Sequence, residues 1–518
     1  MSKTASPLLH ELIHHLSKSE KRYFKLHASR HTIGKENNYV KIFDYIAQQD
    51  EYDEELLFEH FKGASFLNQF SISKKRLYDQ IIKALNSYHT DNSVTSSIYK
   101  NLHSAEVLYK KGLYEHAMRQ LKSAHRLAKK HEKITLLQKV ELEIDQVNES
   151  TGYTTTSEEE LEQQTKSWKN TNTARVYYKE LWLLKSKLFI RLNRLGPSRS
   201  EAEQASFQSI FRAYKQLSIP AHQTFENEHL ANHFESAYYF AVLDKKNSLK
   251  CLKKNMRLFQ TEKNKIKQHP DLYLSLLTNI IHLESTIGEE KNIHAYLGEL
   301  RTMKQRYKIA SDEDFDIKHF SSSSSIELLI YIQQAHFNKA VALEQKLIKG
   351  IQLYEHGITP IRKAYLYFNL GIAFFGNEDY NSSLKWINAI LNAPDLNQKE
   401  DIIIYAQLLH LIIHYELNSE QLLPYAIKNT LRQIRKHGGD ASFESTFISY
   451  LRKVINAKSS FESETILRKA LEELTAFNEN PYSTVAFEYF DFKSWMLSKI
   501  KRKGFKTIKR EAYLNKSA

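Results

Sequence analysis

The chain has 518 residues, too many for a single compact core, and a net charge of +14. It contains only 14 glycines and 8 prolines, which argues against a strand-rich fold with frequent turns and favours an all-helical one. Its one cysteine, Cys251, excludes internal disulfides and cysteine-based zinc knuckles.

Two general properties indicate a cytoplasmic protein. No stretch reaches the roughly 18 apolar residues of a membrane span, and the first residues lack the uninterrupted apolar run of a secretory leader. A lone cysteine also fits a reducing compartment. We therefore expect a cytoplasmic location and no transmembrane segment.

The first motif along the chain is His10-Glu11-Leu12-Ile13-His14, a match to the zinc-binding H-E-x-x-H pattern. On a helix, His10 and His14 would share one face and could bind zinc, with Glu11 as a general base. Only nine residues precede the motif, however, which leaves no room for an upstream substrate-aligning strand. The neighbouring leucines also form an ordinary core-facing stripe. We interpret the segment as a structural helix and expect neither metal nor catalytic residues.

Residues 1–95 are predicted to form a helical module. Ser17 and Glu20 make a capping box that begins one helix, and apolar residues at helical spacing predict three more before residue 89. The last of these helices carries Lys74, Lys75 and Arg76 near its start, where a helix-turn-helix protein contacts DNA. The connection before it, Gly63 to Phe70, is about twice as long as a tight helix-turn-helix turn. A cap for the following helices is therefore the favoured interpretation of this module.

Residues 96–480 are predicted to form helical hairpins. Around residues 98–131, Ala105 and Ala117 allow two antiparallel helices to approach, Gly112 makes the turn and Tyr114 fills the gap to the next hairpin. This spacing resembles a tetratricopeptide-repeat (TPR) unit. A second copy lies around residues 361–394, centred on Gly371, and weaker matches lie between them. The resemblance implies an irregular TPR-like α-solenoid.

In TPR proteins the first helix of each pair lines a concave ligand-binding face. Carried over to this chain, that face would be apolar and aromatic, which suits a protein helix or an apolar peptide. Chaperone-tail clamps use Lys and Asn at positions where this chain has other residues, so that role is disfavoured. The alternative is that neighbouring helices cover the face. The expected partner-binding residues are Tyr99, Leu102, Glu106, Tyr109, Lys110, Tyr365, Phe368, Ile372 and Phe375.

Two polar stretches interrupt the helical pattern. Residues 151–157 are rich in threonine and lead into a new capping signal, and Ser321–Ser325 is a run of five serines. Both are predicted to be exposed loops, and the serine run is the better candidate for a hinge.

Residues 481–518 combine aromatic anchors with basic residues. From residue 493 onward there are nine Lys or Arg and one acid, a net charge of +8 out of +14. Such a segment could bind RNA or an anionic membrane surface. The alternative is a capping helix that buries Trp495 and ends in a solvated basic tail. The candidate anion-binding residues are Lys501, Arg502, Lys503, Lys506, Lys509 and Arg510.

The favoured function is a non-enzymatic protein–protein adaptor or regulator. No glycine-rich phosphate loop or nucleophile elbow occurs, and no cofactor is expected. The first alternative is a nucleic-acid-associated factor that uses the C-terminal tail or the N-terminal module. The second is a peptide-sensing transcriptional regulator, because some TPR receptors carry a DNA-binding domain before their repeats. The sequence leaves the oligomeric state and the partner open.

Overall fold

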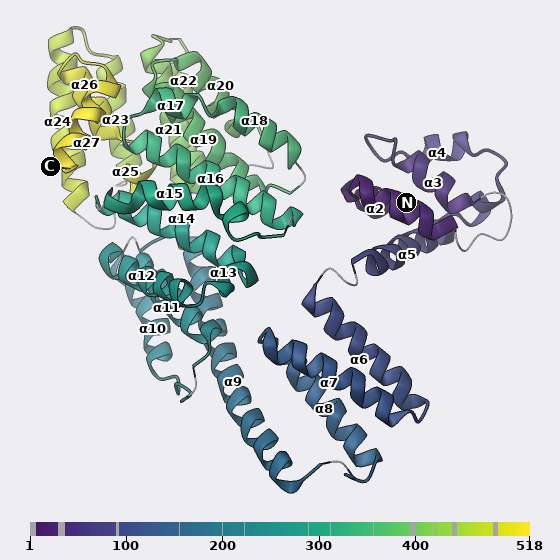
Figure 1. Ribbon diagram of the computed structural model, residues 1–518. Helices are drawn as coiled ribbons and strands as arrows, with labels where there is room; N and C mark the ends of the chain where they lie inside the picture. Colours follow the sequence, from purple (N-terminus) through teal and green to yellow (C-terminus); the bar gives the residue numbers. More distant parts are fainter. Residues whose placement is uncertain are drawn as a thin grey trace. The chain divides into compact units, whose positions relative to one another are not determined.

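The computed structural model is helical throughout the part of the chain that it describes, with no strand there, which confirms the all-α class (Figure 1). None of the helices it describes is long and apolar enough to cross a bilayer. The described residues are 7–29, 37–89, 93–154, 156–198, 200–221, 223–288, 290–310, 312–355, 357–393, 400–419, 421–437, 443–479 and 485–517.

The chain divides into two compact units, Met1–Asn172 and Thr173–Ala518. The division falls inside one long helix, α9, and the predicted boundaries after residues 95 and 480 lie within the two units. Unit 1 contains α1 (Leu8–His15), α2 (Lys18–Ser29), α3 (Asn38–Ile46), α4 (Glu54–His60), the 3₁₀ helix η1 (Ser65–Gln69), α5 (Phe70–His89), α6 (Val94–Lys110), α7 (Tyr114–Lys130), α8 (Ile134–Ser150) and the first part of α9 (Glu158–Leu195).

Unit 2 begins with the second part of α9. It continues with α10 (Glu201–Lys215), α11 (Phe225–Ala241), α12 (Lys245–Thr261), α13 (Asn264–Gln268), α14 (Pro270–Ile287), η2 (Glu290–Asn292), α15 (Ile293–Arg306), α16 (Glu313–Gln333), α17 (Phe337–Val341), α18 (Glu344–Leu353), α19 (Pro360–Gly376), α20 (Tyr380–Leu391), α21 (Glu400–Glu416), α22 (Leu423–His437), α23 (Phe443–Ile455), α24 (Ser460–Glu479), α25 (Val485–Tyr489), α26 (Phe492–Ile500) and α27 (Phe505–Ser517).

Unit 1 has two separate apolar cores. One joins α1–α5 and the other joins α6–α8, so the predicted N-terminal module has a core of its own. The predicted capping box is confirmed, since the Ser17 N–H donates to Glu20 Oε2 at 2.8 Å and the Glu20 N–H donates to Ser17 Oγ at 3.3 Å. These two bonds satisfy backbone donors that the helix start would otherwise leave unpaired.

The α6–α7 hairpin forms as the sequence predicts. Ala105 and Ala117 are both buried between the two packed helices. Their small methyl side chains allow the two backbones to approach closely. Gly112 lies in the turn with a φ of 72°, a left-handed conformation that costs glycine little. Two antiparallel helices joined by such a short turn are the local unit on which the TPR resemblance rests.

Two later hairpins cross through small residues at the same spacing. In α19–α20, a Cβ on Gly371 would lie 2.7 Å from Ile387 Cδ1, and the Ser383 hydroxyl donates to the Gly371 carbonyl at 2.7 Å. In α11–α12, the Ser248 hydroxyl donates to the Ser236 carbonyl at 2.9 Å. Each pair is separated by twelve positions, as Ala105 and Ala117 are. The repeated unit is therefore a tight crossing between consecutive helices.

Most hairpin turns reach the left-handed conformation without glycine. In each, the residue after the left-handed one donates its N–H to a carbonyl five positions back, as in the 3.0 Å bond from Asp379 to Phe374. This pattern ends a helix and satisfies its last carbonyls. The left-handed residues at these turns include Glu132, Leu243, Ala335, Glu378 and Asn418.

The first helices of successive hairpins in unit 2 pack on one another. α14 packs on α16, α16 on α19, and α19 on α21, while α15, α17, α20 and α22 each pack on the first helix of their own pair. The C-terminal helices α25–α27 share one apolar core with α16–α24 (Figure 1). Residues 485–517 are therefore an integral part of unit 2.

The serine run is not a loop. Ser321–Ser325 lies in the middle of α16, and both Ser321 and Ser324 are buried. Serine costs a helix only about 0.5 kcal/mol per residue relative to alanine, and the burial of neighbouring apolar residues of α16 outweighs this. The loop prediction was therefore wrong here. The stretch 151–154 is a turn, and Thr155 lies outside the described residues.

Candidate ligand-binding groove

The predicted partner-binding residues on α19 are covered. Phe368, Ile372 and Phe375 are at most 4% exposed. Helices α25–α27 cover them in part, since the ring of Phe375 lies 5.4 Å from Phe490 and 5.3 Å from Phe505. Phe368 and Phe375 therefore do not line an open concave face, contrary to the expectation from the TPR pattern, whereas Ile372 lines the cavity described below.

The predicted residues on α6 have mixed environments. Leu102 is 7% exposed and belongs to the core of α6–α8, so its placement on an open face was wrong. Tyr99 is 58% exposed. Glu106 and Lys110 are exposed and form an ion pair with each other. Tyr109 is half-buried, and its hydroxyl forms a 2.8 Å hydrogen bond with a serine of α8.

The C-terminal segment is attached to unit 2 by an anchoring tryptophan. Trp495 is 1% exposed, as the capping alternative predicted, and its Nε1 donates to Glu416 Oε1 of α21 at 2.7 Å. Lys499 forms an ion pair with the same carboxylate. A buried ring and a shared carboxylate fix α26 against α21.

The basic tail is not solvated as predicted, because it forms helix α27 and packs on unit 2. The side chain of Lys506 donates to Asn338 of α17 at 2.8 Å, and Arg510 donates to the Gln334 carbonyl at the end of α16 at 2.7 Å. Cations with such intramolecular partners are poorly placed to neutralise phosphates.

The remaining tail cations lie at the α26–α27 turn or inside the molecule. Lys501 and Arg502 are exposed, and Lys503 pairs with Glu511 at 2.8 Å. Lys509 is 13% exposed and pairs with Asp491 Oδ2 at 2.9 Å. The predicted anion-binding group therefore does not gather on one surface.

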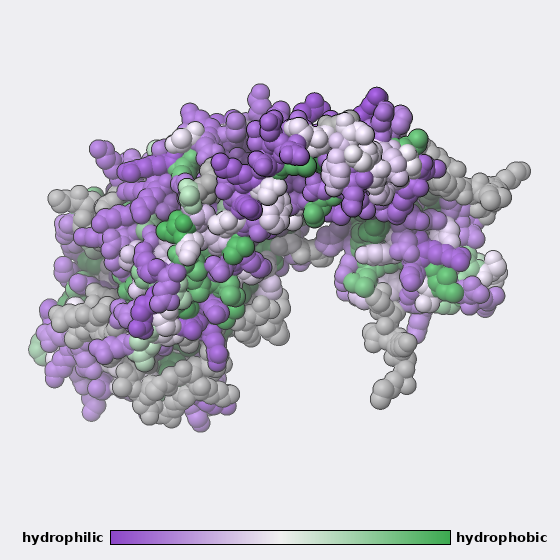
Figure 2. Space-filling view, turned by 90° about the horizontal axis from the view of Figure 1, so that it is seen from below, coloured by the Kyte–Doolittle hydropathy of each residue, from purple (hydrophilic) through white to green (hydrophobic). Residues whose placement is uncertain are grey.

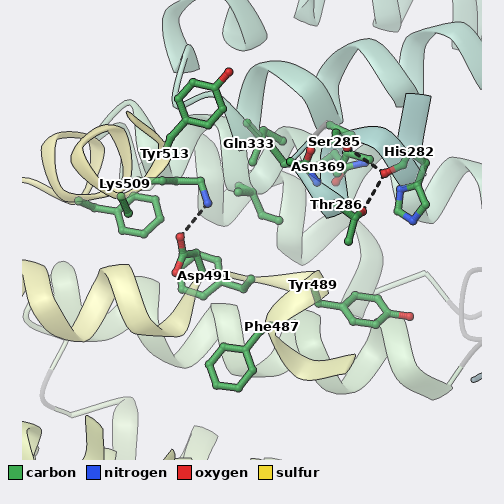
Figure 3. Close-up of a pocket in the computed structure, with 17 residues that line it drawn as sticks. His282, Ser285, Thr286, Gln333, Asn369, Phe487, Tyr489, Asp491, Lys509 and Tyr513 are labelled. Atoms are coloured by element: carbon green, nitrogen blue, oxygen red, sulfur yellow. Dashed lines mark hydrogen bonds and ion pairs between the residues drawn. The ribbon is translucent and has the colours of Figure 1, made fainter. Parts of the chain in front are cut away.

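The folding back of the C-terminal segment creates a cavity of about 290 Å³ between it and helices α14, α16 and α19 (Figure 3). A second cavity of about 290 Å³ adjoins the first, since His282 and Leu329 line both. We call the two together the α14–α16–α19 groove. The second cavity is further lined by Thr278, Asn279, Ser321, Ser322, Ser325, Ile326, Arg362 and Tyr365.

One end of the first cavity is lined by hydroxyl and amide groups (Figure 3). Ser285 and Thr286 both donate to the His282 carbonyl, at 2.9 and 2.7 Å. Gln333 Oε1 is buried and has no hydrogen-bond partner among the described residues. Asn369 lines the same cavity. A buried acceptor without a donor is costly, so this end of the cavity favours a ligand that brings N–H groups.

The other end of the cavity holds the Lys509–Asp491 ion pair (Figure 3). Burial alone would raise the pKa of Asp491, but the positive charge of Lys509 and two hydrogen bonds from Ser494 lower it below its usual value. The Ser494 N–H bond, at 2.9 Å, also makes Asp491 the N-cap of α26. The two charges compensate each other, and the cavity has no net charge there.

The H-E-x-x-H motif lies in a structural helix. His14 Nε2 lies 3.2 Å from the carbonyl oxygen of Ile46 at the end of α3, and His10 Nε2 lies 2.9 Å from that of Gln49 in the turn that follows. Within the described ranges, no group of three His, Cys, Asp or Glu side chains is arranged to hold a metal.

The predicted DNA-contacting residues on α5 are not all exposed and available to bind phosphates. Lys74 pairs with Glu54 of α4 at 2.8 Å and is 18% exposed, whereas Lys75 and Arg76 are exposed. α5 also begins at Phe70, so these residues lie in its second turn rather than its first. The arrangement fits a structural module better than a recognition helix.

Sequence reasoning missed the α14–α16–α19 groove. Some of its residues were singled out, but for other roles: Tyr365 and Ile372 for a concave face, Lys509 and the aromatic anchors Phe487, Tyr489, Phe490 and Phe505 for the C-terminal segment, and the serine run for a loop. The groove joins side chains from helices more than two hundred positions apart, from His282 to Tyr513, and no local pattern links them. No protein-family model matches the chain, and a search of curated proteins finds no relative.

Proposed function

We propose that this protein is a non-enzymatic adaptor that binds a peptide segment of a partner protein in the α14–α16–α19 groove. The observation that carries the proposal is the unpaired Gln333 Oε1 beside Asn369 in the wall of the first cavity. A peptide main chain offers N–H donors and carbonyl acceptors at regular intervals, and side-chain amides can pair with both.

The size of the groove supports an extended ligand. Ligand pockets for compact small molecules usually enclose about 300–1,000 Å³. Each cavity here, at about 290 Å³, is at the lower limit, but the two adjoin each other through the shared lining residues His282 and Leu329. A chain that places one or two side chains in each cavity would fill the groove better than one compact metabolite.

The charge of the first cavity favours a ligand without strong net charge, because Asp491 and Lys509 neutralise each other. In the second cavity Arg362 donates to the Ser321 hydroxyl at 3.3 Å and keeps its positive charge, which suits a peptide carbonyl group. Phe487 and Tyr489 add apolar surface to the first cavity. An apolar peptide with a free main chain matches this lining.

The TPR-like pattern is a second line of support. In TPR proteins ligands lie along the first helices of successive pairs, and α14, α16 and α19 are the first helices of theirs. We extend the TPR resemblance to unit 2 as part of this proposal. The nucleic-acid alternative through the C-terminal tail is not favoured, because Lys506, Lys509 and Arg510 have intramolecular partners.

The test is a selection of peptides from a random display library on the full chain, followed by affinity measurements on variants. Gln333→Leu and Asn369→Leu each remove an amide at similar volume. Each substitution should lower the affinity for the selected peptides about fivefold, and the two together about 25-fold, because each lost hydrogen bond costs about 1 kcal/mol.

Gln352→Leu is the matched control, since Gln352 is exposed on α18 outside the groove, and it should leave affinity unchanged. Peptides that bind the control and the double variant equally would place the binding site elsewhere and refute the proposal. Failure to select any peptide would also count against it.

A further inference from the structure

Helix α7 of unit 1 has two faces of opposite character. Its inner face, which packs on α6 and α8, consists of four buried apolar residues. Its outer face carries five cations, which follow one another at three or four residues except for the adjacent last two, with Glu115 at one end as the single acid of that face. The inner residues are Ala117, Leu121, Ala124 and Ala128, and the outer cations are Arg119, Lys122, Arg126, Lys129 and Lys130.

Arg119, Lys122, Arg126 and Lys130 form a row along one side of the helix, and Lys129 lies beside the last of them. Residues three and four apart lie on one side of a helix, so Arg119 to Lys130 spans about 17 Å at a rise of about 1.5 Å per residue. All five are exposed, and within the described part of the chain none forms an ion pair or a side-chain hydrogen bond. Acids on the neighbouring α8 do not neutralise the row. Glu141 faces His125 at 3.5 Å and Glu143 pairs with Lys139 at 3.1 Å.

The chemistry of the outer face restricts the partner. A membrane-binding helix needs apolar side chains beside its cations, and a protein interface is usually built around aromatic and apolar anchors. Proteins that bind single-stranded nucleic acid add aromatic rings on which bases stack. The exposed residues of α7 are Glu115, the five cations and His116 near the N-terminal end of the helix, so the face has no large apolar or aromatic anchor beside its cations. A regular row of phosphates, in contrast, can be bound by a surface that offers only positive charges.

We propose that the outer face of α7 binds the phosphate backbone of double-stranded nucleic acid without reading its sequence. Lys and Arg at this spacing act as point charges on successive phosphates and release condensed counterions. Cations that reach only the backbone set position and affinity but carry no base specificity. The surface is independent of the peptide groove and adds a second binding activity to the adaptor.

The test measures binding of the full chain to fluorescein-labelled DNA and RNA duplexes of about two helical turns by fluorescence anisotropy. Five engaged cations predict that the logarithm of the association constant falls with the logarithm of salt concentration with a slope of about −4.5 for DNA. Duplexes of unrelated sequence should bind equally, and a single strand should bind more weakly. The two duplex types show which nucleic acid is preferred.

The decisive variant is the triple substitution Arg119→Gln, Arg126→Gln and Lys130→Gln. It should make the slope shallower by about 2.7, with unchanged circular dichroism and melting temperature because all three side chains are exposed. The matched control is Lys75→Gln, Arg76→Gln and Lys83→Gln, which removes the same charge from exposed positions of α5.

Three results would overturn the proposal. They are no duplex binding at about 50 mM salt, an equal loss in the α5 control, and tighter binding to phosphatidylserine vesicles or to an acidic polypeptide than to either duplex. An equal loss in the control would mean that net charge, rather than the α7 row, attracts the probe.

Discussion

The α6–α7 hairpin of unit 1 and the α19–α20 hairpin of unit 2 cross in the same way but differ in what surrounds them. Both bring two helices together through small residues twelve positions apart. In α19, however, ten of seventeen residues are buried, whereas in α6 three of seventeen are. The same local pattern therefore produces a helix exposed on one side in one unit and a helix buried on most sides in the other.

The difference comes from contacts made across long stretches of chain. On α19, the Tyr365 hydroxyl lies 3.4 Å from that of Tyr489, a residue 124 positions later. On α6, Tyr99 and Val107 stay exposed. A repeat pattern thus specifies the pairing of neighbouring helices, while the coverage of their outer faces depends on distant segments.

The largest effect should follow from removal of the anchor of the C-terminal segment. Trp495→Ala loses a fully buried indole and the hydrogen bond to Glu416, and we expect unit 2 to lose about 3–5 kcal/mol of unfolding free energy. Denaturant unfolding measures the loss, and hydrogen exchange should show faster exchange in α19 but not in the α6–α7 hairpin. Trp182→Ala, at a tryptophan that is 42% exposed, is the control and should cost far less. Equal losses would contradict the anchoring role.

The next largest effect should come from acidification, which should destabilise unit 2 more than the α6–α7 hairpin of unit 1. Burial, together with neighbouring positive charge, lowers the pKa of His229 to about 3, and burial beside His414 lowers that of His410 to about 4. Both belong to unit 2, whereas His103 and His116 of the α6–α7 hairpin are exposed. A neutral buried imidazole contributes stability that is complete above its unfolded pKa of 6.5 and is lost as pH falls from there toward the folded value.

At about pH 5 the buried imidazole of His229 and the half-buried one of His410 should therefore each cost unit 2 about 2 kcal/mol relative to neutral pH. Unfolding by denaturant at both pH values measures the loss, and His229→Gln should remove its share of the pH dependence. Hydrogen exchange, corrected for the intrinsic effect of pH, should change less in the α6–α7 hairpin. Stability that is constant or rises on acidification would show that these histidines are protonated in the folded protein.

The sequence predicted what depends on neighbours in the chain. The Ser17 capping box and the Ala105–Ala117 crossing were correct because each involves residues within a few turns of one another. The exposure of Phe368 and Phe375 was not predicted correctly, because their cover comes from residues after 485.

The two remaining misses have different physical causes. Ser321–Ser325 was assigned to a loop by composition, although small side chains are suited to the crowded middle of α16. The groove was missed because Gln333 and Asn369 are ordinary polar residues in their own helices. Their common wall exists only after α16 and α19 pack and the C-terminal segment folds over them.

A smaller effect should distinguish the two glycines that carried the repeat pattern. Gly371→Ala adds a methyl group within 2.7 Å of Ile387 Cδ1 in the α19–α20 crossing, and overpacking should cost about 1–3 kcal/mol. The matched Gly112→Ala meets nothing within 4 Å, so any cost there comes from the left-handed φ of 72° alone. Gly112→Asn should be better tolerated than Gly112→Ala, because asparagine adopts this conformation more readily. At Gly371, asparagine should be worse than alanine, since space is the limit there.

The smallest effect concerns the turns of the same two hairpins. Glu378 takes the left-handed position in the α19–α20 turn, with a φ of 64°, where α6–α7 has Gly112. For a residue other than glycine, this conformation costs roughly 1–2 kcal/mol of free energy. Glycine avoids that cost but loses more conformational entropy on folding, which is worth about 0.4–1 kcal/mol. Glu378→Gly should therefore stabilise unit 2 by about 0.5–1 kcal/mol, and Gly112→Ala should destabilise unit 1 by a similar amount.

The two variants are expected to change the unfolding free energy in opposite directions, which makes the comparison informative although each change is small. If turn geometry alone decides, thermal unfolding should shift upward for Glu378→Gly and downward for Gly112→Ala. Glu378 is exposed, so its removal takes little packing away, although a Cβ on Gly504 would lie 2.5 Å from its Oε1. A destabilised Glu378→Gly would mean that this carboxylate helps to hold the α26–α27 turn. The coverage of the α19–α20 hairpin by the C-terminal segment would then extend to its turn.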